Sequence, residues 1–295
     1  MKNSRLYAIT GANGRTGSAA ARYLLECGAA VRVVLRNDSH AASWLAQGAE
    51  VAIADLGDRA ALTKAFTGVH GAYIVSPQQY AREDLFDYAE HMASNVAHAV
   101  RAAGVTQVVA LSSVGADRTE GSGWIAMNRV LEQRLLEAGL NVACLRAAYF
   151  MENWQSLLPG AVAEGVLHSF VAPLSVSLPM VATEDIGRCA AQLLLEGFEG
   201  SPVVELEGPQ GYSPADVAQA LAGLLGKAVR AEVIAVENWP AALAQAGFSR
   251  AGLAGFSEMT QALNAGQLHY AKDGRYLHRR GATTLQACLG RMLQL

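Results

Sequence analysis

The sequence predicts an α/β protein built on a doubly wound parallel sheet, with a smaller and mainly helical C-terminal lobe. Short apolar runs alternate with helix-length segments through the first half of the chain, and several of those segments end at a glycine. Runs this apolar are typical of strands buried on both faces of a sheet. Their alternation with helices is the pattern of repeated strand-helix-strand units, which pair in parallel.

The elements of the first half follow in order. The runs that predict strands are residues 6–10, 31–35, 51–54, 72–76, 108–112 and 142–146. The segments that predict helices are residues 15–28, 58–66, 81–103 and 124–138. We expect them to form a nucleotide-binding domain over residues 1–155.

After residue 155 the alternation becomes irregular. A helix is expected from Thr183, as its N-cap, toward Gly197, and a strand over residues 203–208. Ser213 followed by proline is typical of a helix start and predicts a helix over residues 215–226. We expect residues 156–295 to form a substrate or partner lobe that packs on the carboxyl edge of the sheet and is partly interleaved with the first domain.

Composition and charge narrow the function classes. A formal net charge of -3 and a charged fraction of 17% argue against direct nucleic-acid binding, which needs a basic surface. The four cysteines show no metal-ligand spacing, so no metal site is predicted, and reduced thiols fit a cytoplasmic protein. Apolar runs end well before the roughly 20 residues that a membrane span requires.

A glycine-rich turn joins the first strand to the first helix. Residues 10–17 read TGANGRTG, with glycine at every third position. Gly11 permits a tight turn, Gly14 lets the backbone approach a pyrophosphate, and Gly17 lets the helix pack closely on the strand. The helix N-terminus offers N–H groups to phosphates. The pattern predicts a Rossmann dinucleotide site formed by Gly11, Ala12, Asn13, Gly14, Arg15, Thr16 and Gly17.

Arg36 follows the second strand, at the position where NAD-binding proteins place an acidic residue for the ribose 2′-hydroxyl. A guanidinium suits a 2′-phosphate instead, and Arg15 is a second candidate for a phosphate. The alternative is that Arg36 is only a solvated charge at a strand end. We expect NADP(H) to be bound in preference to NAD(H).

Polar residues also follow the third and fourth strands. Asp55 and Leu56 are expected at the adenine edge, and Ser76, Pro77 and Gln78 near the nicotinamide ribose. Each residue taken singly is also an ordinary turn former. Their placement at successive strand ends favours the binding role.

Several segments resemble the NmrA-like branch of the atypical short-chain dehydrogenases/reductases, and the resemblance covers nearly the whole chain. They are TGANGRTG (10–17), VRVVLRN (31–37), GAEVAIADLGD (48–58), AYFMENW (148–154) and PMVATEDIGRCAAQLLLEG (179–197). This family includes fungal nitrogen regulators, a mammalian NADPH sensor, and bacterial quinone and azo-dye reductases. The resemblance implies that Phe150, Glu152 and Asn153 line the nicotinamide end of the cofactor, and that residues 179–185 close the pocket.

The sequence departs from the family pattern at the catalytic acid. Short-chain reductases use a Tyr-x-x-x-Lys pair, and no tyrosine here has a lysine four residues later. Some NmrA-like relatives carry a lysine where this chain has Asn128, which donates a hydrogen bond but supplies no charge. Ser112 and Ser113 end the fifth strand, where the superfamily places a substrate-polarising serine, and serve equally as strand-end hydrogen bonders. The catalytic residues stay unassigned, with Ser112 and Asn128 as candidates.

Two functions remain open at this stage. The first is hydride transfer from NADPH to a small quinone-like or azo acceptor, with water supplying the proton. The second is a non-catalytic NADPH/NADP sensor that acts through a protein partner. An epimerase is disfavoured because it needs an internal base. A homodimer is left open.

Overall fold

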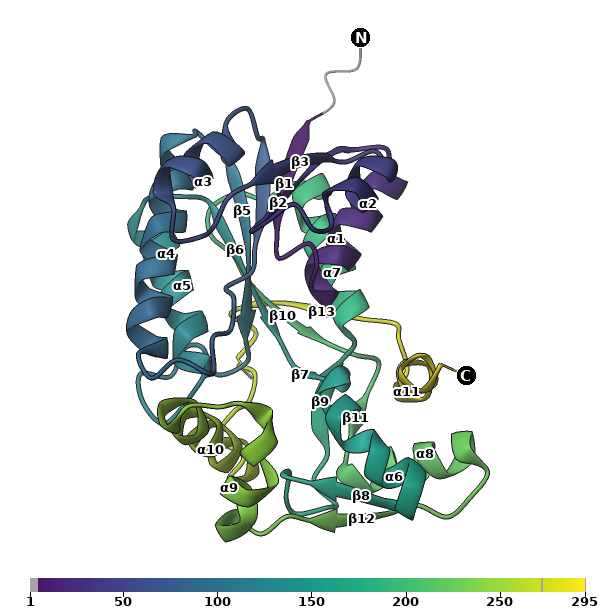
Figure 1. Ribbon diagram of the computed structural model, residues 1–295. Coiled ribbons are helices and arrows are strands. Elements are labelled where there is room, and N and C mark those ends of the chain that lie inside the picture. Colours follow the sequence, from purple (N-terminus) through teal and green to yellow (C-terminus); the bar gives the residue numbers. More distant parts are fainter. Residues whose placement is uncertain (1–4, 272, 295) are drawn as a thin grey trace.

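The computed structural model describes residues 5–271 and 273–294, and one large parallel sheet lies at its centre (Figure 1). Its eight strands follow the order β13-β10-β6-β5-β4-β1-β2-β3, and every neighbouring pair is parallel. The strands are β1 (Leu6–Thr10), β2 (Ala30–Leu35), β3 (Glu50–Ile53), β4 (Gly71–Ile74), β5 (Gln107–Ser113), β6 (Val142–Ala147), β10 (Val203–Glu207) and β13 (Leu277–Arg280). The α/β class with a doubly wound parallel sheet is confirmed.

Helices cover both faces of the sheet (Figure 1). One face carries α1 (Arg15–Glu26), α2 (Ala41–Ala46) and α7 (Thr183–Glu196), and the other carries α3 (Arg59–Phe66), α4 (Leu85–Ala102) and α5 (Ile125–Glu137). The strands therefore contribute to two separate apolar cores. Tyr73 packs into the core on the α1 side and Ile74 into the core on the α4 side, as alternation along a strand requires.

Helix α7 packs closely against α1 because Gly187 carries no side chain. A Cβ at Gly187 would lie 2.4 Å from the Thr16 carbonyl oxygen and 2.5 Å from the Ala19 Cβ. Only glycine allows the two helix backbones to approach this far. The helix that carries the glycine turn is thus held in place by a helix from the second half of the chain.

The second half of the chain also builds a lobe at the carboxyl edge of the sheet (Figure 1). Its core contains Trp154, Leu158, Met180, Leu221 and Leu289. Two small sheets, in the orders β11-β9-β7 and β12-β8, belong to it. The remaining elements are β7 (Tyr149–Phe150), η1 (Met151–Leu157), α6 (Leu158–Glu164), β8 (Val166–Ser169), β9 (Leu178–Val181), β11 (Gly211–Tyr212), α8 (Pro214–Leu225), β12 (Arg230–Val233), η2 (Val236–Asn238), α9 (Trp239–Ala242), η3 (Ala244–Ala246), α10 (Arg250–Asn264) and α11 (Leu285–Leu293).

Two expected helix starts had different outcomes. Ser213 caps α8 as predicted, because its hydroxyl accepts from the Asp216 N–H while the Asp216 carboxylate accepts from the Ser213 N–H. The prediction that Thr183 is an N-cap is wrong. Thr183 is the first residue of α7, and Ala182 occupies the cap position without a side-chain hydrogen bond.

Among the described helices, none is both long and apolar enough to cross a membrane. The described residues also hold no group of three or more histidine, cysteine, aspartate or glutamate side chains that is placed to bind a metal ion.

Candidate cofactor and substrate site

The predicted cofactor residues lie along one edge of the main sheet. Because all the strands are parallel, their carboxyl ends meet at the same edge, which is where folds of this class bind ligands. The glycine turn follows β1, Arg36 follows β2, and Asp55 with Leu56 follows β3. The segment 76–78 follows β4. Residues far apart in the sequence are thereby brought to one side of the fold.

The glycine turn has the geometry that the spacing predicts. Gly11 adopts a φ of 63°, a left-handed conformation that glycine accepts without strain, and the Gly14 N–H donates to the Gly11 carbonyl oxygen at 2.8 Å. A Cβ at Gly17 would lie 2.2 Å from the same carbonyl oxygen. Gly17 therefore has to be glycine for α1 to begin this close to the turn.

The N-terminus of α1 fits a phosphate group. Gly14 occupies the cap position, no side chain of the described residues caps the helix, and its first turn contains no acidic residue. The first N–H groups of a helix have no partner inside the helix, and together they carry positive partial charge. An uncapped helix start behind a glycine turn is the donor set that a pyrophosphate needs.

Thr10 links the glycine turn to the next loop of the site, a role that sequence reasoning missed. Its hydroxyl donates to the Tyr73 carbonyl oxygen at 3.2 Å and accepts from the Val75 N–H at 2.8 Å. The side chain is buried. Thr10 thus fixes the segment after β4 against the end of β1. The one signal for it was its place at the last position of the first strand.

Arg36 is exposed, and no salt bridge in the described part of the chain involves it. The turn that follows it is ordered by Asn37, whose side-chain oxygen accepts from the Ser39 N–H at 3.2 Å and from the Ser39 hydroxyl at 2.6 Å. Asn13 of the glycine turn accepts a hydrogen bond from the Trp44 indole N–H at 3.1 Å. The structure therefore ties the glycine turn to α2 and, among the described residues, leaves the guanidinium of Arg36 without a carboxylate.

Residues after the third and fourth strands have a mixed environment. The exposed Asp55 accepts from the Gly57 N–H at 2.7 Å, so part of its hydrogen-bonding capacity is used in a local turn. Leu56 is half-buried, as are Ser76 and Pro77, and Gln78 is exposed. Leu56 packs against the core on the α4 side, whereas Asp55 and Gln78 are exposed to solvent.

Glu152 joins the segment after β7 to the start of α7. Its carboxylate accepts from the Thr183 N–H, with 3.0 Å to each oxygen, and from the Thr183 hydroxyl at 2.6 Å. This is the missing cap of α7, supplied by a residue 31 positions earlier. Arg15 donates to Gln155 from the same region, so the glycine turn also contacts η1. Phe150 is half-buried against the main core, and Asn153 is exposed.

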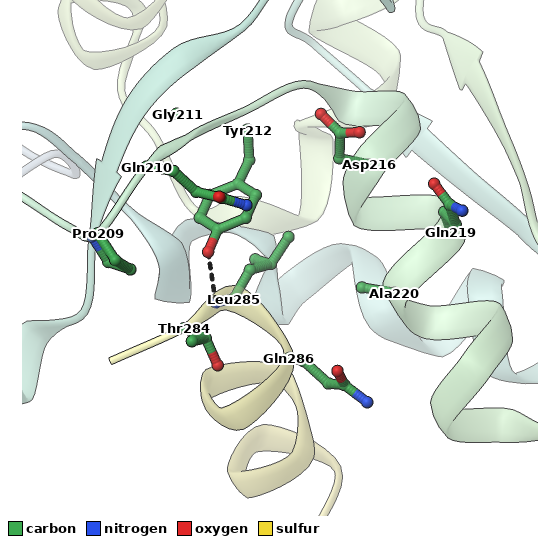
Figure 2. Close-up of a pocket in the computed structure, with 10 residues that line it drawn as sticks. All are labelled: Pro209, Gln210, Gly211, Tyr212, Asp216, Gln219, Ala220, Thr284, Leu285 and Gln286. Carbon is green, nitrogen blue, oxygen red and sulfur yellow. Dashed lines mark hydrogen bonds between the residues drawn. The ribbon is translucent and has the colours of Figure 1, made fainter. Parts of the chain in front are cut away.

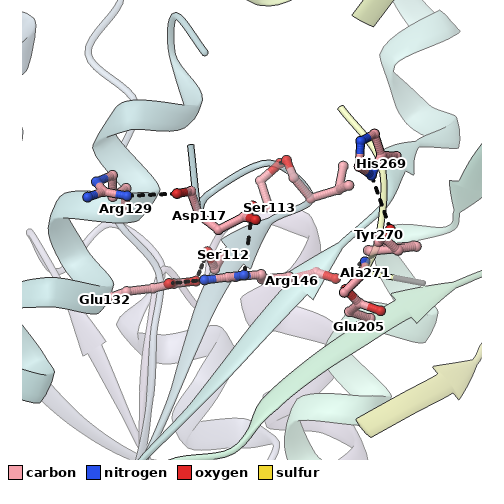
Figure 3. A network of polar contacts seen from close by, with 11 residues as sticks. Ser112, Ser113, Asp117, Arg129, Glu132, Arg146, Glu205, His269, Tyr270 and Ala271 are labelled. Carbon is pink, nitrogen blue, oxygen red and sulfur yellow. Dashed lines mark hydrogen bonds and ion pairs between the residues drawn. The ribbon is translucent and has the colours of Figure 1, made fainter. Parts of the chain in front are cut away.

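Ser112 belongs to a buried polar network at the ends of β5 and β6 (Figure 3). Its hydroxyl donates to Glu132 of α5 at 2.5 Å, and Arg146 donates to both oxygens of that carboxylate at 3.0 and 2.8 Å. Burial alone would lower the pKa of Arg146, but the hydrogen bonds and charge of Glu132 raise it above its ordinary value. The Ser112 proton is therefore engaged by Glu132. Asn128, one turn earlier on α5, is half-buried and makes no side-chain hydrogen bond to another described residue.

Two surface pockets differ in their relation to the predicted cofactor residues. One, of about 680 Å³, lies between β11 and the starts of α8 and α11, where the Tyr212 hydroxyl accepts from the Leu285 N–H at 3.2 Å (Figure 2). None of the predicted cofactor residues lines it. The other, of about 290 Å³, lies between α1 and α7 and includes Arg15 and Glu152.

Comparison with known proteins places the chain in a family. The model of the NmrA-like family matches residues 3–266. The chain belongs to the NmrA-like family. The chain is similar to quinone oxidoreductase 2 of Escherichia coli strain K12, with 30% identity over 245 residues, 82% of each protein. The NAD(P)H azoreductase of Xenophilus azovorans is 27% identical over 234 residues, 78% of this chain and 77% of that protein.

A solved structure agrees with this family assignment. The crystal structure of an NADPH-dependent quinone oxidoreductase from Escherichia coli, complexed with NADPH, superimposes with a TM-score of 0.80 at 26% sequence identity. The match covers 97% of this chain and 99% of the other. The similarity therefore extends over both the main sheet and the lobe of this NmrA-like protein.

Proposed function

We propose that this protein is an NADPH-dependent oxidoreductase that transfers a hydride to a small electron-poor acceptor, a quinone or an azo compound. The observation that carries the proposal is the glycine turn with its uncapped helix, placed beside an arginine that has no carboxylate partner among the described salt bridges. Relatives that share most of the chain are named for quinone and azo reduction.

The residues present suit a nucleotide with a 2′-phosphate. The N–H groups at the start of α1 would bind the pyrophosphate, and Arg36 would pair with the 2′-phosphate. Asp55 and Leu56 would contact the adenine, and the segments 76–78 and 150–153 would line the nicotinamide end. Arg36 is the residue that would make NADPH preferred over NADH.

When bound, NADPH supplies a hydride, so that a quinone, this hydride and one proton give a hydroquinone and NADP⁺. The chain's own part is to orient the cofactor and the acceptor. Thr10 holds the loop after β4 in place, and Asn128 would donate a hydrogen bond to the acceptor oxygen from the first turn of α5. Ser112 is committed to Glu132, so we assign the proton to water.

The test is NADPH oxidation by the purified protein with a panel of quinones and azo dyes, with NADH in parallel. Arg36→Asp is expected to raise the KM for NADPH by about tenfold to a hundredfold, the worth of hydrogen bonds to a charged group. It should not raise the KM for NADH, because an acidic residue at this position can accept a hydrogen bond from the ribose 2′-hydroxyl. Arg101→Asp makes the same charge change at an exposed position near the end of α4, and should alter neither KM.

Two outcomes would contradict the proposal. Equal KM values for NADPH and NADH in the unmodified protein would remove the role of Arg36. Tight binding of NADPH without turnover of any acceptor would favour the redox sensor, and a change of protease sensitivity between NADPH and NADP⁺ would then be the observation to seek.

A further inference from the structure

An aromatic cluster lies where the loop after β4 meets the start of α5 and α10. The ring of Tyr80 is stacked on the indole of Trp124, with 3.4 Å between ring centroids and 12° between ring planes. Phe248 turns its edge toward both rings, with centroid separations of 5.6 and 5.1 Å. Phe256 packs against Trp124 at 5.4 Å. We refer to these four residues as the aromatic cluster.

The cluster stands among the residues assigned to the nicotinamide and the acceptor. Tyr80 follows the segment 76–78 by two residues, and Trp124 immediately precedes α5. Asn128 lies four residues after Trp124, so both side chains project from the same face at the start of the helix. The stacked pair is therefore placed at the carboxyl edge of the sheet, where an acceptor would have to enter.

The stack of Tyr80 on Trp124 is not the arrangement that two such rings prefer. Both rings are rich in electrons, and the negative faces of two such rings repel when they lie directly over one another. Offset or edge-on contacts, such as those that Phe248 makes, are favoured instead. A ring that is poor in electrons, such as a quinone, has no such repulsion and suits the face of an indole better than the ring of Tyr80 does.

The buried indole N–H of Trp124 is a second unfavourable feature of this arrangement. The side chain is 8% exposed, and no atom of the described residues makes a hydrogen bond with its Nε1. The backbone of α10 covers it, because a Cβ at Gly255 would lie only 2.9 Å from Nε1 and 2.5 Å from Cδ1. A buried donor without an acceptor is unfavourable, and water satisfies it as soon as the cover is displaced.

The cover over Trp124 is tied together as one unit, the flap, which consists of residues 80–83 and the start of α10. The Ser249 N–H donates to the Tyr80 carbonyl oxygen at 2.9 Å, and its hydroxyl donates to the Arg82 carbonyl oxygen at 2.8 Å. The carboxylate of Glu83 accepts from the N–H groups of Arg250 and Ala251 at 3.0 and 3.1 Å. Tyr80 therefore cannot move far without carrying the N-terminus of α10 with it.

From these contacts we infer that Trp124 is the binding platform for the ring of the acceptor, and that Tyr80 occupies the place of that ring while the flap is closed. The acceptor class is a flat, electron-poor ring, a quinone in the first instance. Opening of the flap relieves the repulsive stack, and the acceptor then takes the indole face. The inference rests on the proposed function, because it names where the acceptor of that reaction binds.

The test compares KM values for a naphthoquinone at saturating NADPH. Trp124→Leu removes the platform and is expected to raise the KM for the quinone about tenfold, with the KM for NADPH unchanged. Tyr80→Leu removes the competing ring and is expected to lower the KM for the quinone severalfold, although it lowers the Tm. If the two rings only stabilised the fold, both variants would have a higher KM for the quinone and a lower Tm.

Trp239→Leu is the matched control. Trp239 is also fully buried in an aromatic environment, but its N–H donates to the Ile234 carbonyl oxygen at 2.8 Å. This variant should lose at least as much stability as Trp124→Leu and leave the KM for the quinone unchanged. An equal rise of that KM in both variants would overturn the inference.

A binding measurement separates this inference from the proposed function. Protein saturated with NADP⁺ has no hydride to transfer, so quenching of tryptophan fluorescence by the naphthoquinone reports binding alone. Saturable quenching that disappears in Trp124→Phe and persists in Trp239→Phe supports the platform, whether or not turnover is found. Quenching that is the same in all three proteins refutes it, and turnover in the unmodified protein would then leave the proposed function standing.

Discussion

Breaking the buried pair of Glu132 and Arg146 is expected to destabilise the protein strongly (Figure 3). The two side chains are 7% and 9% exposed, and the carboxylate is met by both the guanidinium and the Ser112 hydroxyl. Asp117 would compensate the charge of Arg146 only weakly, because its carboxylate lies 3.9 Å from the guanidinium and its side chain is 60% exposed. Glu132→Leu therefore leaves a guanidinium buried without a close counter-charge.

The magnitude follows from this geometry. Removing one partner of a buried ion pair costs about 3–5 kcal/mol, because the remaining charge stays desolvated. For a chain of 295 residues that corresponds to a fall in Tm of about 5 to 8 °C. Replacing both residues, as Glu132→Leu with Arg146→Met, removes the two charges together. We expect that double variant to lose only about 1–2 kcal/mol, the cost of leaving the Ser112 hydroxyl without its acceptor.

Thermal unfolding of the unmodified protein, both single variants and the double variant measures the coupling directly. Each single variant is expected to be less stable than the double variant. If the losses in the single variants add up to the loss in the double variant, the two side chains are independent and the buried pair has no energetic role.

Three further predictions concern the packing and the helix caps. Gly187→Ala should lower the free energy of unfolding by about 1–3 kcal/mol, because the added Cβ would meet the backbone of α1. Gly223→Ala should raise it by up to ~1 kcal/mol, because the added Cβ would meet no described atom within 4 Å. Urea unfolding measures both changes, and changes of the opposite sign would contradict this account of the packing. Glu152→Gln should weaken the cap of α7, which lowers the free energy of unfolding by about 1 kcal/mol and lowers the Tm. An unchanged Tm would show that the start of α7 does not depend on the Glu152 carboxylate. Hydrogen bonds from Ser213 lower the pKa of Asp216 below its ordinary 3.8, so this cap stabilises the protein above pH 3.8 and its contribution is lost as the pH falls through the lowered pKa. Ser213→Ala should therefore cost about 0.5–2 kcal/mol at pH 7 and less in acid. A loss of stability that is constant with pH would contradict this prediction.

The predictable part of the fold was the part encoded locally. The first six strands were confirmed because each is an apolar run between turn residues, and the cap at Ser213 was confirmed because serine and proline act within one helical turn. Strand β13 was not predicted, since its sequence LHRR is polar and Leu277 is 54% exposed. It is a strand because β10 offers it a free edge.

The unpredicted features of the site are contacts between residues distant in the sequence. Three contacts form only once the backbone has folded: the cap of α7 by Glu152, the hydrogen bond between Thr10 and Val75, and the stack of Tyr80 on Trp124. No local pattern announces such pairs. The glycine turn could be predicted from the sequence because its conformational requirement acts on adjacent residues. The cofactor roles of the individual side chains stay predictions.

The order of strands in the main sheet has a consequence for synthesis of the protein. Strand β6 is buried along its whole length, and its outer edge is paired with β10, which in turn is covered by β13 near the end of the chain. A nascent chain that has emerged only as far as residue 155 therefore exposes an apolar strand edge, which is a template for aggregation. We expect the emerging first half to depend on chaperones until residues 203–207 arrive, and a gene truncated at residue 155 to yield insoluble product.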